Sequence, residues 1–572
     1  MRAMARRGLL GGLAPGAGWT LAERALATTQ RDRGARGSSV GARPDGKTDR
    51  AYMLDLLRRM AAPVLSRVAL GQLQRDWTPE LSPTWDGHDR HRPVAGLPDR
   101  LRPGDGRFRR SGSLLSPGSA RRKRENRVKG AIGSGLIALA TLGPAATAQA
   151  PAARTIEAID RVWSSHAVGF AIAADTQRTV VAYYDANRQL SVAVRARSGG
   201  WTYHRLDSWT GWDSHNYVAA AIDADGQIHV VANLHNDPLV YFRTTRAGDP
   251  RTLTRIATLV DPARERRMTY PVFLRSHDGT LILKYRDGGS GNGNEIYVAY
   301  DLATRRWRPL LATPLADGEG RRNAYFVGPV TGPDGRFHLA WVWRDTPDAA
   351  TNHDLSYAVS DDLMHWQRSD GRPLDLPLRL DSSEIVDPVP VRAGMINNNS
   401  VIGFDRAGRP IITYHKFVAD GSTQIFLARR EARGWRIAQA SRWRGFRWDF
   451  GGGGSLASRL IVFGARPGAS GQLVTRVIRD GRAIDLVVDD ATLAPIAERP
   501  ARTLADTLRP DLSPPSGMVL NTAACGGSAI AWASRPPNRD QAPRTLTEPT
   551  TLYFVSPPGA PHDARCDGVD PG

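Results

Sequence analysis

The sequence predicts an all-β protein built as a β-propeller of about seven blades. Runs that alternate apolar and polar residues recur along the chain, Asp-Gly turns join several of them, and no helical pattern separates one set of runs from the next. The turn glycines Gly226, Gly279 and Gly335 are 53 and 56 residues apart. Three- to four-stranded units that recur at this length are typical of propeller blades.

Five copies of the unit can be followed in chain order. Each begins with an apolar run and a tight turn that contains Gly or Asp, and further runs follow, the last of which often ends near a Trp. Asp-Gly indicates a hairpin because these residues tolerate the positive φ of a type I′ turn. The runs are 172–175, 180–184 and 190–195; 218–222, 228–231 and 240–243; 272–274, 281–285 and 296–300; 337–341 and 355–359; and, in a fifth copy that begins with 401–408, 411–414 and 425–429.

The last part of the chain continues the strand pattern, but the turns between its runs are less clearly marked. Residues 460–463, 473–478, 484–488 and 552–555 are strand-like, enough for about two more blades. Seven blades is the expected number, and six or eight also fit because the sixth blade is poorly marked.

The net charge of +20 is concentrated near the N-terminus. Residues 1–127 hold 26 Lys and Arg against 12 Asp and Glu, whereas residues 151–572 hold 50 against 45. So small a surplus over the long C-terminal part gives no electrostatic footprint for nucleic acid. The chain also has no run of 18 apolar residues, which argues against a membrane-spanning helix.

The N-terminal part contains a signal-peptide pattern far from the recorded start. Basic residues at 121–129 precede an apolar run at 131–142 and then Ala148-Gln149-Ala150, a small-x-small cleavage pattern. We expect residues 1–127 to be untranslated, with a start near Val128, or else to be a disordered Arg-rich tail. We expect 128–150 to be a signal peptide, 151–572 to be the catalytic propeller, and the mature protein to be secreted or periplasmic.

Both cysteines, Cys525 and Cys566, lie near the C-terminus. Since the exported compartment is oxidising, we expect them to form a disulfide that fastens the end of the fold. Two cysteines without a CxxC motif exclude a zinc-thiolate site, and we expect no metal at the active site.

Four polar residues flank the expected inner strands. His215 precedes and His235 follows one hairpin, and Tyr270 precedes and Arg286 follows the next. The outer ends of an antiparallel pair meet, so these residues are expected at the same end of adjacent blades, where propellers bind their ligands.

Residues 160–450 resemble the propeller polysaccharide lyases, namely ulvan lyases and rhamnose–glucuronate lyases, which are related to the BNR-4 repeat proteins. The resemblance rests on residues 212–216, 231–236, 268–271 and 284–288. In those lyases a His pair about 20 residues apart, followed by a Tyr and an Arg 16 apart, forms the catalytic cluster. The separations in this chain are 20 and 16.

The resemblance implies β-elimination at a uronate. This reaction removes the C5 proton, stabilises charge on the carboxylate and protonates the departing O4. Arg286, helped by His235, is expected to pair with the carboxylate. His215 and Tyr270 are expected to share the acid and base roles, since a Tyr beside Arg is expected to lose its proton more easily. By resemblance, Tyr270 is the acid, or both acid and base on a glucuronate, and His215 takes the proton on an iduronate.

Further residues are candidates for substrate binding. Their positions at the expected channel mouth, or their aromatic faces, suit contacts with a sugar. They are Trp212, Asn216, Tyr325, Asn398 and His415. Each also has a structural interpretation, such as blade packing for the aromatic residues and a turn for the Asn run.

Two other functions stay open. A propeller glycoside hydrolase would need two carboxylates, for which Asp213, Asp287, Glu384 and Asp387 are available. A glycan-binding propeller without catalytic activity is the other. The favoured prediction is a monomeric lyase of an acidic polysaccharide that requires no cofactor. By resemblance a structural calcium ion is compatible with it, although no EF-hand-like loop supports one.

Overall fold

The structure, a computed structural model, describes residues 154–197, 199–556 and 566, which all lie in one compact unit. The expected N-terminal tail and signal peptide lie outside the described residues. Strands dominate, and the regular helices of this part are α5 (Leu504–Leu508) and the 3₁₀ turns η2 (Pro250–Thr252), η3 (Arg264–Arg266) and η4 (Ala349–Thr351). Within the same residues, no helix has the length and apolar character needed to cross a bilayer.

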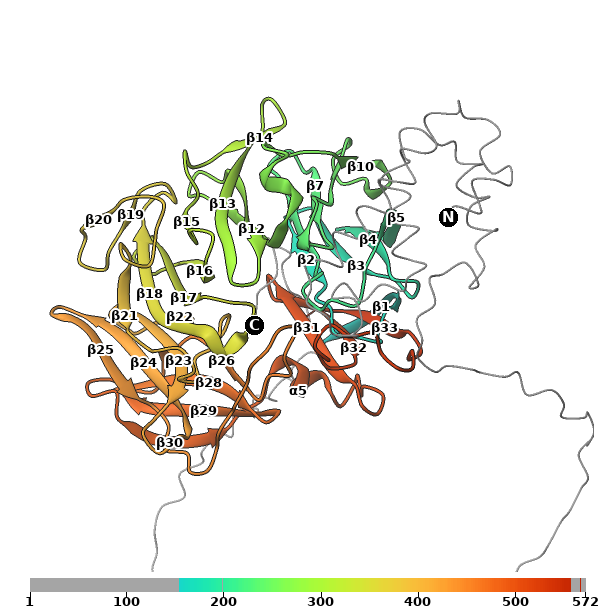
Figure 1. The fold of residues 1–572 in the computed structure, drawn as a ribbon. Coiled ribbons are helices and arrows are strands. Elements are labelled where there is room, and N and C mark those ends of the chain that lie inside the picture. Colours follow the sequence, from blue (N-terminus) through green and yellow to red (C-terminus); the bar gives the residue numbers. More distant parts are fainter. Residues whose placement is uncertain (1–153, 198, 557–565, 567–572) are drawn as a thin grey trace, which may run out of the picture. The chain divides into compact units, whose positions relative to one another are not determined.

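The described strands form seven antiparallel sheets that follow one another along the chain (Figure 1). Sheet 1 holds β2 (Ala171–Ala174), β3 (Arg178–Tyr184), β4 (Gln189–Ala196) and β5 (Trp201–Trp209). Sheet 2 holds β6 (Ala219–Ile222), β7 (Ile228–Val231), β9 (Tyr241–Thr244) and β10 (Leu253–Ile256). Sheet 3 holds β11 (Met268–Arg275), β12 (Leu281–Gly289), β13 (Asn292–Asp301) and β14 (Arg306–Pro309), with β8 (His235–Asp237) and β15 (Ala316–Asp317) added.

The later sheets keep the same order. Sheet 4 holds β16 (Asn323–Thr331), β17 (Phe337–Arg344), β18 (Asn352–Ser360), β19 (Trp366–Gln367), β20 (Pro373–Leu374) and β21 (Glu384–Asp387). Sheet 5 holds β22 (Val401–Phe404), β23 (Pro410–Phe417), β24 (Thr423–Glu431) and β25 (Gly434–Gln439). Sheet 6 holds β26 (Leu460–Val462), β27 (Arg466–Pro467), β28 (Gln472–Arg479), β29 (Arg482–Asp489) and β30 (Pro495–Pro500). Sheet 7 holds β31 (Val519–Cys525), β32 (Ser528–Ser534), β33 (Thr550–Ser556) and β1 (Thr155–Val162).

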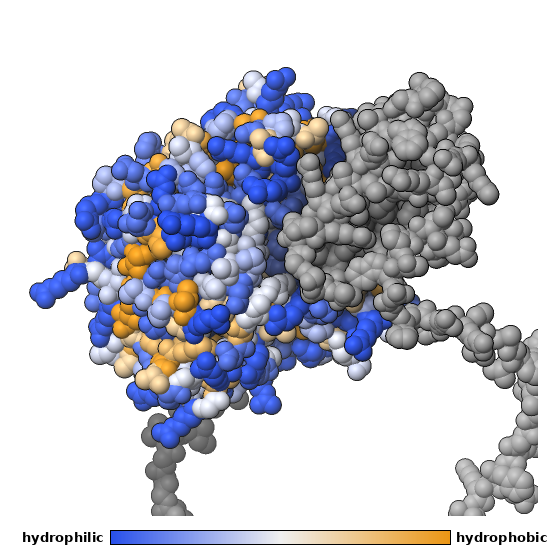
Figure 2. Space-filling view, in the orientation of Figure 1, coloured by the Kyte–Doolittle hydropathy of each residue, from blue (hydrophilic) through white to orange (hydrophobic). Residues whose placement is uncertain are grey.

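The hydrophobic core lies between neighbouring sheets. Separate clusters of buried apolar side chains join sheets 2 and 3, sheets 3 and 4, sheets 4 and 5, and sheets 5 and 6, and the largest cluster joins sheets 7, 1 and 2. First strands of neighbouring sheets are in contact, as β2 is with β6 and with β31. Hydrophilic residues cover most of the described surface in Figure 2, with apolar residues in patches between them. This arrangement confirms the predicted all-β propeller class.

The ends of the described chain join the last sheet to the first. β1 pairs with β33, so the first described strand completes sheet 7. Cys525 on β31 forms a disulfide with Cys566, and the backbone of Cys566 exchanges two hydrogen bonds of 3.2 Å with Ala174 on β2. The disulfide therefore fastens a segment that bridges sheets 7 and 1.

The Asp-Gly turns are tight, but they are not the expected type I′ turns. Such a turn needs positive φ at both central residues, and Asp225, Asp278 and Asp334 are not among the described residues with positive φ. Gly226, Gly279 and Gly335 have φ values of 78°, 83° and 76°. Each turn closes within a few residues, since the glycine N–H donates to a carbonyl three positions earlier. These turns lie at the opposite ends of the hairpins from the residues described next.

Candidate functional site

A cavity of about 340 Å³ collects three of the four predicted catalytic residues. His215, His235, Tyr270 and Arg344 line it, together with asparagines 397–399 and part of the segment 454–461. No Asp or Glu is among the described residues that line it. Its walls therefore carry basic and neutral groups, which suits a negatively charged ligand.

Two strands and one loop deliver the His pair. His215 lies in the connection from β5 to β6, whereas His235 begins β8, which leaves sheet 2 and pairs with β11 of sheet 3. Their rings stack with centroids 4.2 Å apart. The exchange of β8 between sheets places the two residues side by side.

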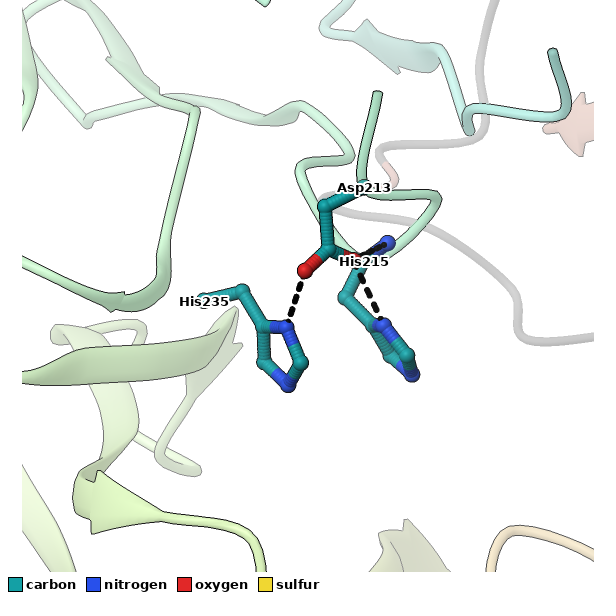
Figure 3. Close-up of side chains that lie close together, drawn as sticks. All are labelled: Asp213, His215 and His235. Carbon is teal, nitrogen blue, oxygen red and sulfur yellow. Dashed lines mark hydrogen bonds and ion pairs between the residues drawn. The ribbon is translucent and has the colours of Figure 1, made fainter. Parts of the chain in front are cut away.

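The Asp213 carboxylate bridges the Nδ1 edges of the two stacked imidazoles (Figure 3). One of its carboxylate oxygens is 2.7 Å from Nδ1 of His215, and the other contacts Nδ1 of His235. Because both Nδ1 atoms contact the carboxylate, they are assigned as the protonated nitrogens. The Nε2 atoms are then free to meet a substrate.

The two imidazoles differ in their pKa. Burial lowers the pKa of His215, but the hydrogen bond to Asp213 and the charges of Asp213 and Asp540 outweigh burial and raise it above the usual value. Burial and the charge of His215 lower the pKa of His235 despite the same carboxylate. An additional proton, beyond the one on each Nδ1, is therefore held more firmly on His215 than on His235. Burial raises the pKa of Asp213, but the hydrogen bonds from both imidazoles hold it well below its usual range.

Tyr270 adopts a strained backbone conformation. It lies in an irregularity of β11 between Thr269 and Val272, and its φ is 54°. A non-Gly residue with positive φ costs free energy and occurs often at functional sites. The strain turns the Tyr270 ring to lie 5.8 Å from the ring of His215 and 6.0 Å from that of Tyr325.

Two arginines flank the two tyrosines. The Arg286 guanidinium lies 4.9 Å from the ring centre of Tyr270 and 5.5 Å from that of Tyr325, and Arg344 lies 5.5 Å from Tyr325. Arg286 is 1% exposed, and its two Nη atoms have no hydrogen-bond partner among the described residues. A buried cation without such partners is costly, and Arg286 is not among the described residues that line the cavity.

The expected ease of deprotonation belongs to Tyr325 and not to Tyr270. Burial and the charge of Tyr325 raise the pKa of Tyr270 above its usual value, and the two arginines do not compensate. For Tyr325, burial is outweighed by the charges of Arg286 and Arg344, which lower its pKa. The prediction for Tyr270 was therefore wrong, because the second arginine lies nearer Tyr325. Tyr270 is suited to donate a proton.

The group Asp213, His215 and His235 brings an oxygen and two nitrogens within 4.8 Å of one another. Metal ions bind such sets when the donor atoms are free. Here both nitrogens already contact the carboxylate. Hydrogen bonding accounts for the arrangement, and no role is assigned to a metal.

The predicted substrate-binding residues divide between the cavity and the interior. Asn398 lines the cavity. Tyr325 is 2% exposed and lies behind Tyr270, while Asn216 is buried and its backbone oxygen accepts a hydrogen bond of 2.6 Å from the hydroxyl of Tyr184.

The other two predicted residues, Trp212 and His415, are buried as Tyr325 and Asn216 are. Trp212 is buried against Trp163 and Arg188, so its faces are not available to a sugar. His415 is 1% exposed and packs against Trp448, and burial lowers its pKa to about 4. Trp212 lies in the connection from β5 to β6 and His415 lies within β23, and other aromatic side chains cover them.

Sequence reasoning missed Arg344 and the contribution of the 451–455 segment. Arg344 is the last residue of β17, and Arg286 follows the corresponding apolar run in sheet 3. The position after such a run, which pointed to Arg286, therefore also pointed to Arg344. The run Gly451-Gly-Gly-Gly-Ser455 was also visible as a composition signal. Its hydroxyl-bearing Ser455 lies 3.2 Å from Nδ1 of His215.

The carboxylates considered for a hydrolase have structural partners. Glu384 accepts hydrogen bonds from Ser369 and Trp435, Asp387 from Tyr414 and Lys416, and Asp287 forms an ion pair with Arg267. None of the three lines the cavity. A pair of acid and base carboxylates is therefore not present on the described walls.

Residues 178–443 match the family described as BNR repeat-containing family member. The predicted family resemblance is confirmed. The matched segment holds His215, His235, Tyr270, Arg286 and Arg344, whereas Ser455 and Asp540 lie beyond it.

Individual relatives match over shorter stretches. The long isoform of ulvan lyase from Alteromonas sp is 28% identical over 146 residues, which are 24% of this chain and 14% of the relative. The short isoform from Alteromonas sp. (strain LOR) is 30% identical over 152 residues, which are 24% of this chain and 28% of the relative. The chain therefore matches less than a third of the length of these curated relatives.

Solved structures also align. The polysaccharide lyase Uly1 is 13% identical, with a TM-score of 0.49 over 70% of this chain and 98% of that one. A PL25 ulvan lyase is 12% identical, with a TM-score of 0.48 over 72% of this chain and 98% of that one.

Proposed function

We propose that the protein is a polysaccharide lyase that cleaves a uronate-containing acidic polysaccharide by β-elimination. The observation that carries this proposal is the cavity wall, on which His215, His235, Tyr270 and Arg344 meet without a carboxylate. The relatives reported above are ulvan lyases, and one aligned structure is described as bound to -[GlcA(1-4)Rha3S]-. A sulfated polymer of glucuronate and rhamnose is therefore the first substrate to test.

The arginines supply the charge that the reaction needs. As the C5 proton leaves, negative charge builds on the uronate carboxylate. Arg344 on the wall and Arg286 behind Tyr270 stabilise this state more than the ground state. Arg344 has neutral hydrogen-bond acceptors, namely the carbonyls of Thr346 and Pro347 and the amide oxygen of Asn397, so its charge is available to a ligand.

The proton-transfer roles follow from geometry and pKa. The imidazole pair accepts the C5 proton through a free Nε2. The lowered pKa of His235 keeps its Nε2 unprotonated at neutral pH, whereas the raised pKa of His215 makes it the stronger base. Tyr270 gives its proton to the departing O4, since its raised pKa keeps the hydroxyl protonated. The C4–O bond breaks as the electrons of the C5–H bond form the C4–C5 double bond.

The remaining expectations become part of the proposal. We infer an exported, monomeric enzyme that needs no metal for turnover, because the arginines can neutralise the carboxylate. Dialysis against a chelator should then leave the rate within about twofold of the untreated protein. A large loss restored by one added cation would contradict this part.

The function is tested by product chemistry on a panel of polymers. Purified protein is incubated with ulvan, rhamnose-glucuronate gums and a neutral glucan as control, and both ultraviolet absorbance and reducing ends are followed. A lyase raises both on the uronate polymers alone. Reducing ends without absorbance would indicate a hydrolase, and neither signal, with binding to the polymer, would indicate a lectin-like propeller.

A further inference from the structure

A short segment of sheet 7 approaches the site from the far end of the chain. Arg539 and Asp540 lie in the connection from β32 to β33, and their φ values are 62° and 61°. Two consecutive non-Gly residues in the left-handed region are costly, and such strain persists only where surrounding contacts hold it. The hydrogen bonds of Asp540 and Arg539 show which loops this segment holds in place.

The Asp540 carboxylate joins two loops that are distant in sequence. One oxygen accepts a hydrogen bond of 3.0 Å from the backbone N–H of Ser214, and the other accepts one of 2.8 Å from the N–H of Ser455. The second oxygen also lies 3.7 Å from Nδ1 of His215. Asp540 is 7% exposed, and among the described residues this imidazole is the one basic group within 4.0 Å of it.

Arg539 fixes the other side of the same connection. Its guanidinium donates to the carbonyls of Gly451 and Gly453 at 3.0 and 3.3 Å, and its backbone N–H donates to the carbonyl of Ser455 at 2.9 Å. A Cβ atom at Gly454 would lie 2.7 Å from the Arg539 carbonyl oxygen. This close approach of the two backbones requires glycine at position 454. We call residues 451–455 the glycine strap.

The glycine strap is also held from sheet 4. The N–H of Gly452 donates to the Asp348 carboxylate at 2.6 Å, and the Gly452 carbonyl accepts from Ala349 at 2.9 Å. The strap thus reaches from sheet 4 to sheet 7 and places the Ser455 hydroxyl 3.2 Å from His215. It forms part of the cavity wall.

Three acceptors surround Nδ1 of His215. They are Asp213 at 2.7 Å, Ser455 at 3.2 Å and Asp540 at 3.7 Å. His235, Tyr270 and the charge of Arg286 face the same ring on its other sides. This surrounding keeps the proton on Nδ1 and directs Nε2 to the cavity.

We propose that Asp540 is a positioning residue that holds His215 in its Nδ1-protonated orientation and ties it to the glycine strap. The inference rests on the proposed function in that it treats His215 as part of the reacting cluster. It extends beyond that function because Asp540 and the strap lie outside the segment that matches the family. Sheet 7 therefore completes a site whose other members come from sheets 2 to 4, the connections beside them and the connection from sheet 5 to sheet 6.

The first test is made on the unaltered protein without substrate. Proton and nitrogen NMR of histidine-labelled protein, with His215 assigned by its loss in His215→Gln, reports the tautomer and titration of this ring. The proposal predicts Nδ1 protonated at high pH. The opposite tautomer overturns it, whether or not any polymer is cleaved.

The second test uses Asp540→Asn, because Asn keeps the shape and tolerates positive φ. The variant should titrate His215 at lower pH than the parent, since one negative charge is removed. On the polymer that the parent cleaves fastest, kcat should fall roughly 10- to 100-fold while KM changes little. Unchanged titration and kcat, or a rise in KM alone, overturns the proposal.

The matched control is Asp480→Asn. Asp480 also has a positive φ, of 47°, but its half-exposed carboxylate pairs with Arg459 outside the cavity. This variant should match the parent in both measurements. If the parent itself cleaves no polymer, the proposed function fails, while the NMR results still decide the role of Asp540.

Discussion

The two ends of the hairpins use different kinds of contact. At the turn end, the N–H of Gly226, Gly279 and Gly335 each bonds to a carbonyl three residues back. At the cavity end, Ser214 bonds to Asp540 across 326 residues, and Ser455 meets His215 across 240. Local contacts shape the blade, whereas contacts between distant segments shape the site. Changes at the turn end should therefore affect stability, and changes at the cavity end should affect activity.

The largest effect on activity is expected from Tyr270→Phe. The substitution keeps the ring and removes the proton that O4 receives, so kcat should fall by roughly 10²–10⁴ while the free energy of unfolding changes little. Steady-state rates and denaturant unfolding measure the two quantities. Tyr203→Phe, at an exposed tyrosine of β5, is the control and should keep the parental rate. A Tyr270→Phe rate near the parental one would remove Tyr270 from the reaction.

A somewhat smaller loss is expected from Arg286→Lys. A lysine keeps the charge but cannot reproduce the planar guanidinium beside Tyr270 and Tyr325, so kcat/KM should fall by about 10²–10³. The affinity for a neutral glucan should not change. A full rate in Arg286→Lys would mean that a point charge suffices and that Arg344 carries the carboxylate contact.

The turn end and the cavity end also differ in how much of each the sequence can predict. The blades follow from alternation and from turn residues that satisfy their own backbone, and these patterns need no knowledge of distant segments. His215, His235, Tyr270 and Arg286 were found because they flank the strands of two adjacent hairpins. Asp540 could not be found in this way, because its hydrogen-bond partners Ser455 and Ser214 lie 85 and 326 residues earlier.

The histidines show a second limit of sequence reasoning. His215 precedes β6 and His415 lies within β23, yet one lines the cavity and the other is covered by Trp448. Trp448 belongs to the connection between β25 and β26, whose path follows from tertiary packing. The position of a residue along a strand therefore predicts at which end of the sheet it lies, but not whether its side chain is exposed.

Loss of the disulfide should reduce stability without changing chemistry. In the chain-entropy model, a bridge across 41 residues contributes about 4 kcal/mol, so the Cys525→Ser, Cys566→Ser double variant should unfold at lower denaturant concentration. The rate below its unfolding transition should match that of the parent. If the double variant is folded but cleaves polymer more slowly, the link between sheets 7 and 1 would also influence the cavity, which contradicts this prediction.

Buried His415 should make stability depend on pH. Its folded pKa of about 4 lies below the usual value of 6.5, so the neutral form is favoured by folding. Its contribution is present above pH 6.5 and is lost as the pH falls toward 4, by about 3 kcal/mol in total. Unfolding free energies measured across this range should fall less steeply in His415→Leu. Equal slopes in both proteins would contradict the account.

The smallest effect is expected at the turn end, from Gly279→Ala. A Cβ there meets nothing within 4 Å, so the cost is the positive φ alone, about 1 kcal/mol of unfolding free energy. Gly279→Asn should recover part of it because Asn tolerates this conformation. Both variants should cleave polymer at the parental rate. A loss of rate would break the division between the two ends.

The central claim is that the cavity breaks a sugar linkage by elimination, and the mass of the products tests it most directly. Ulvan or another cleaved uronate polymer is digested by the parent, and the oligosaccharides are weighed by mass spectrometry, with Tyr270→Phe as a parallel digest. The account predicts products whose non-reducing ends are lighter by one water than hydrolysis products and are unsaturated, and far fewer of them from the variant. Products that have gained a water at each cleaved bond would contradict it.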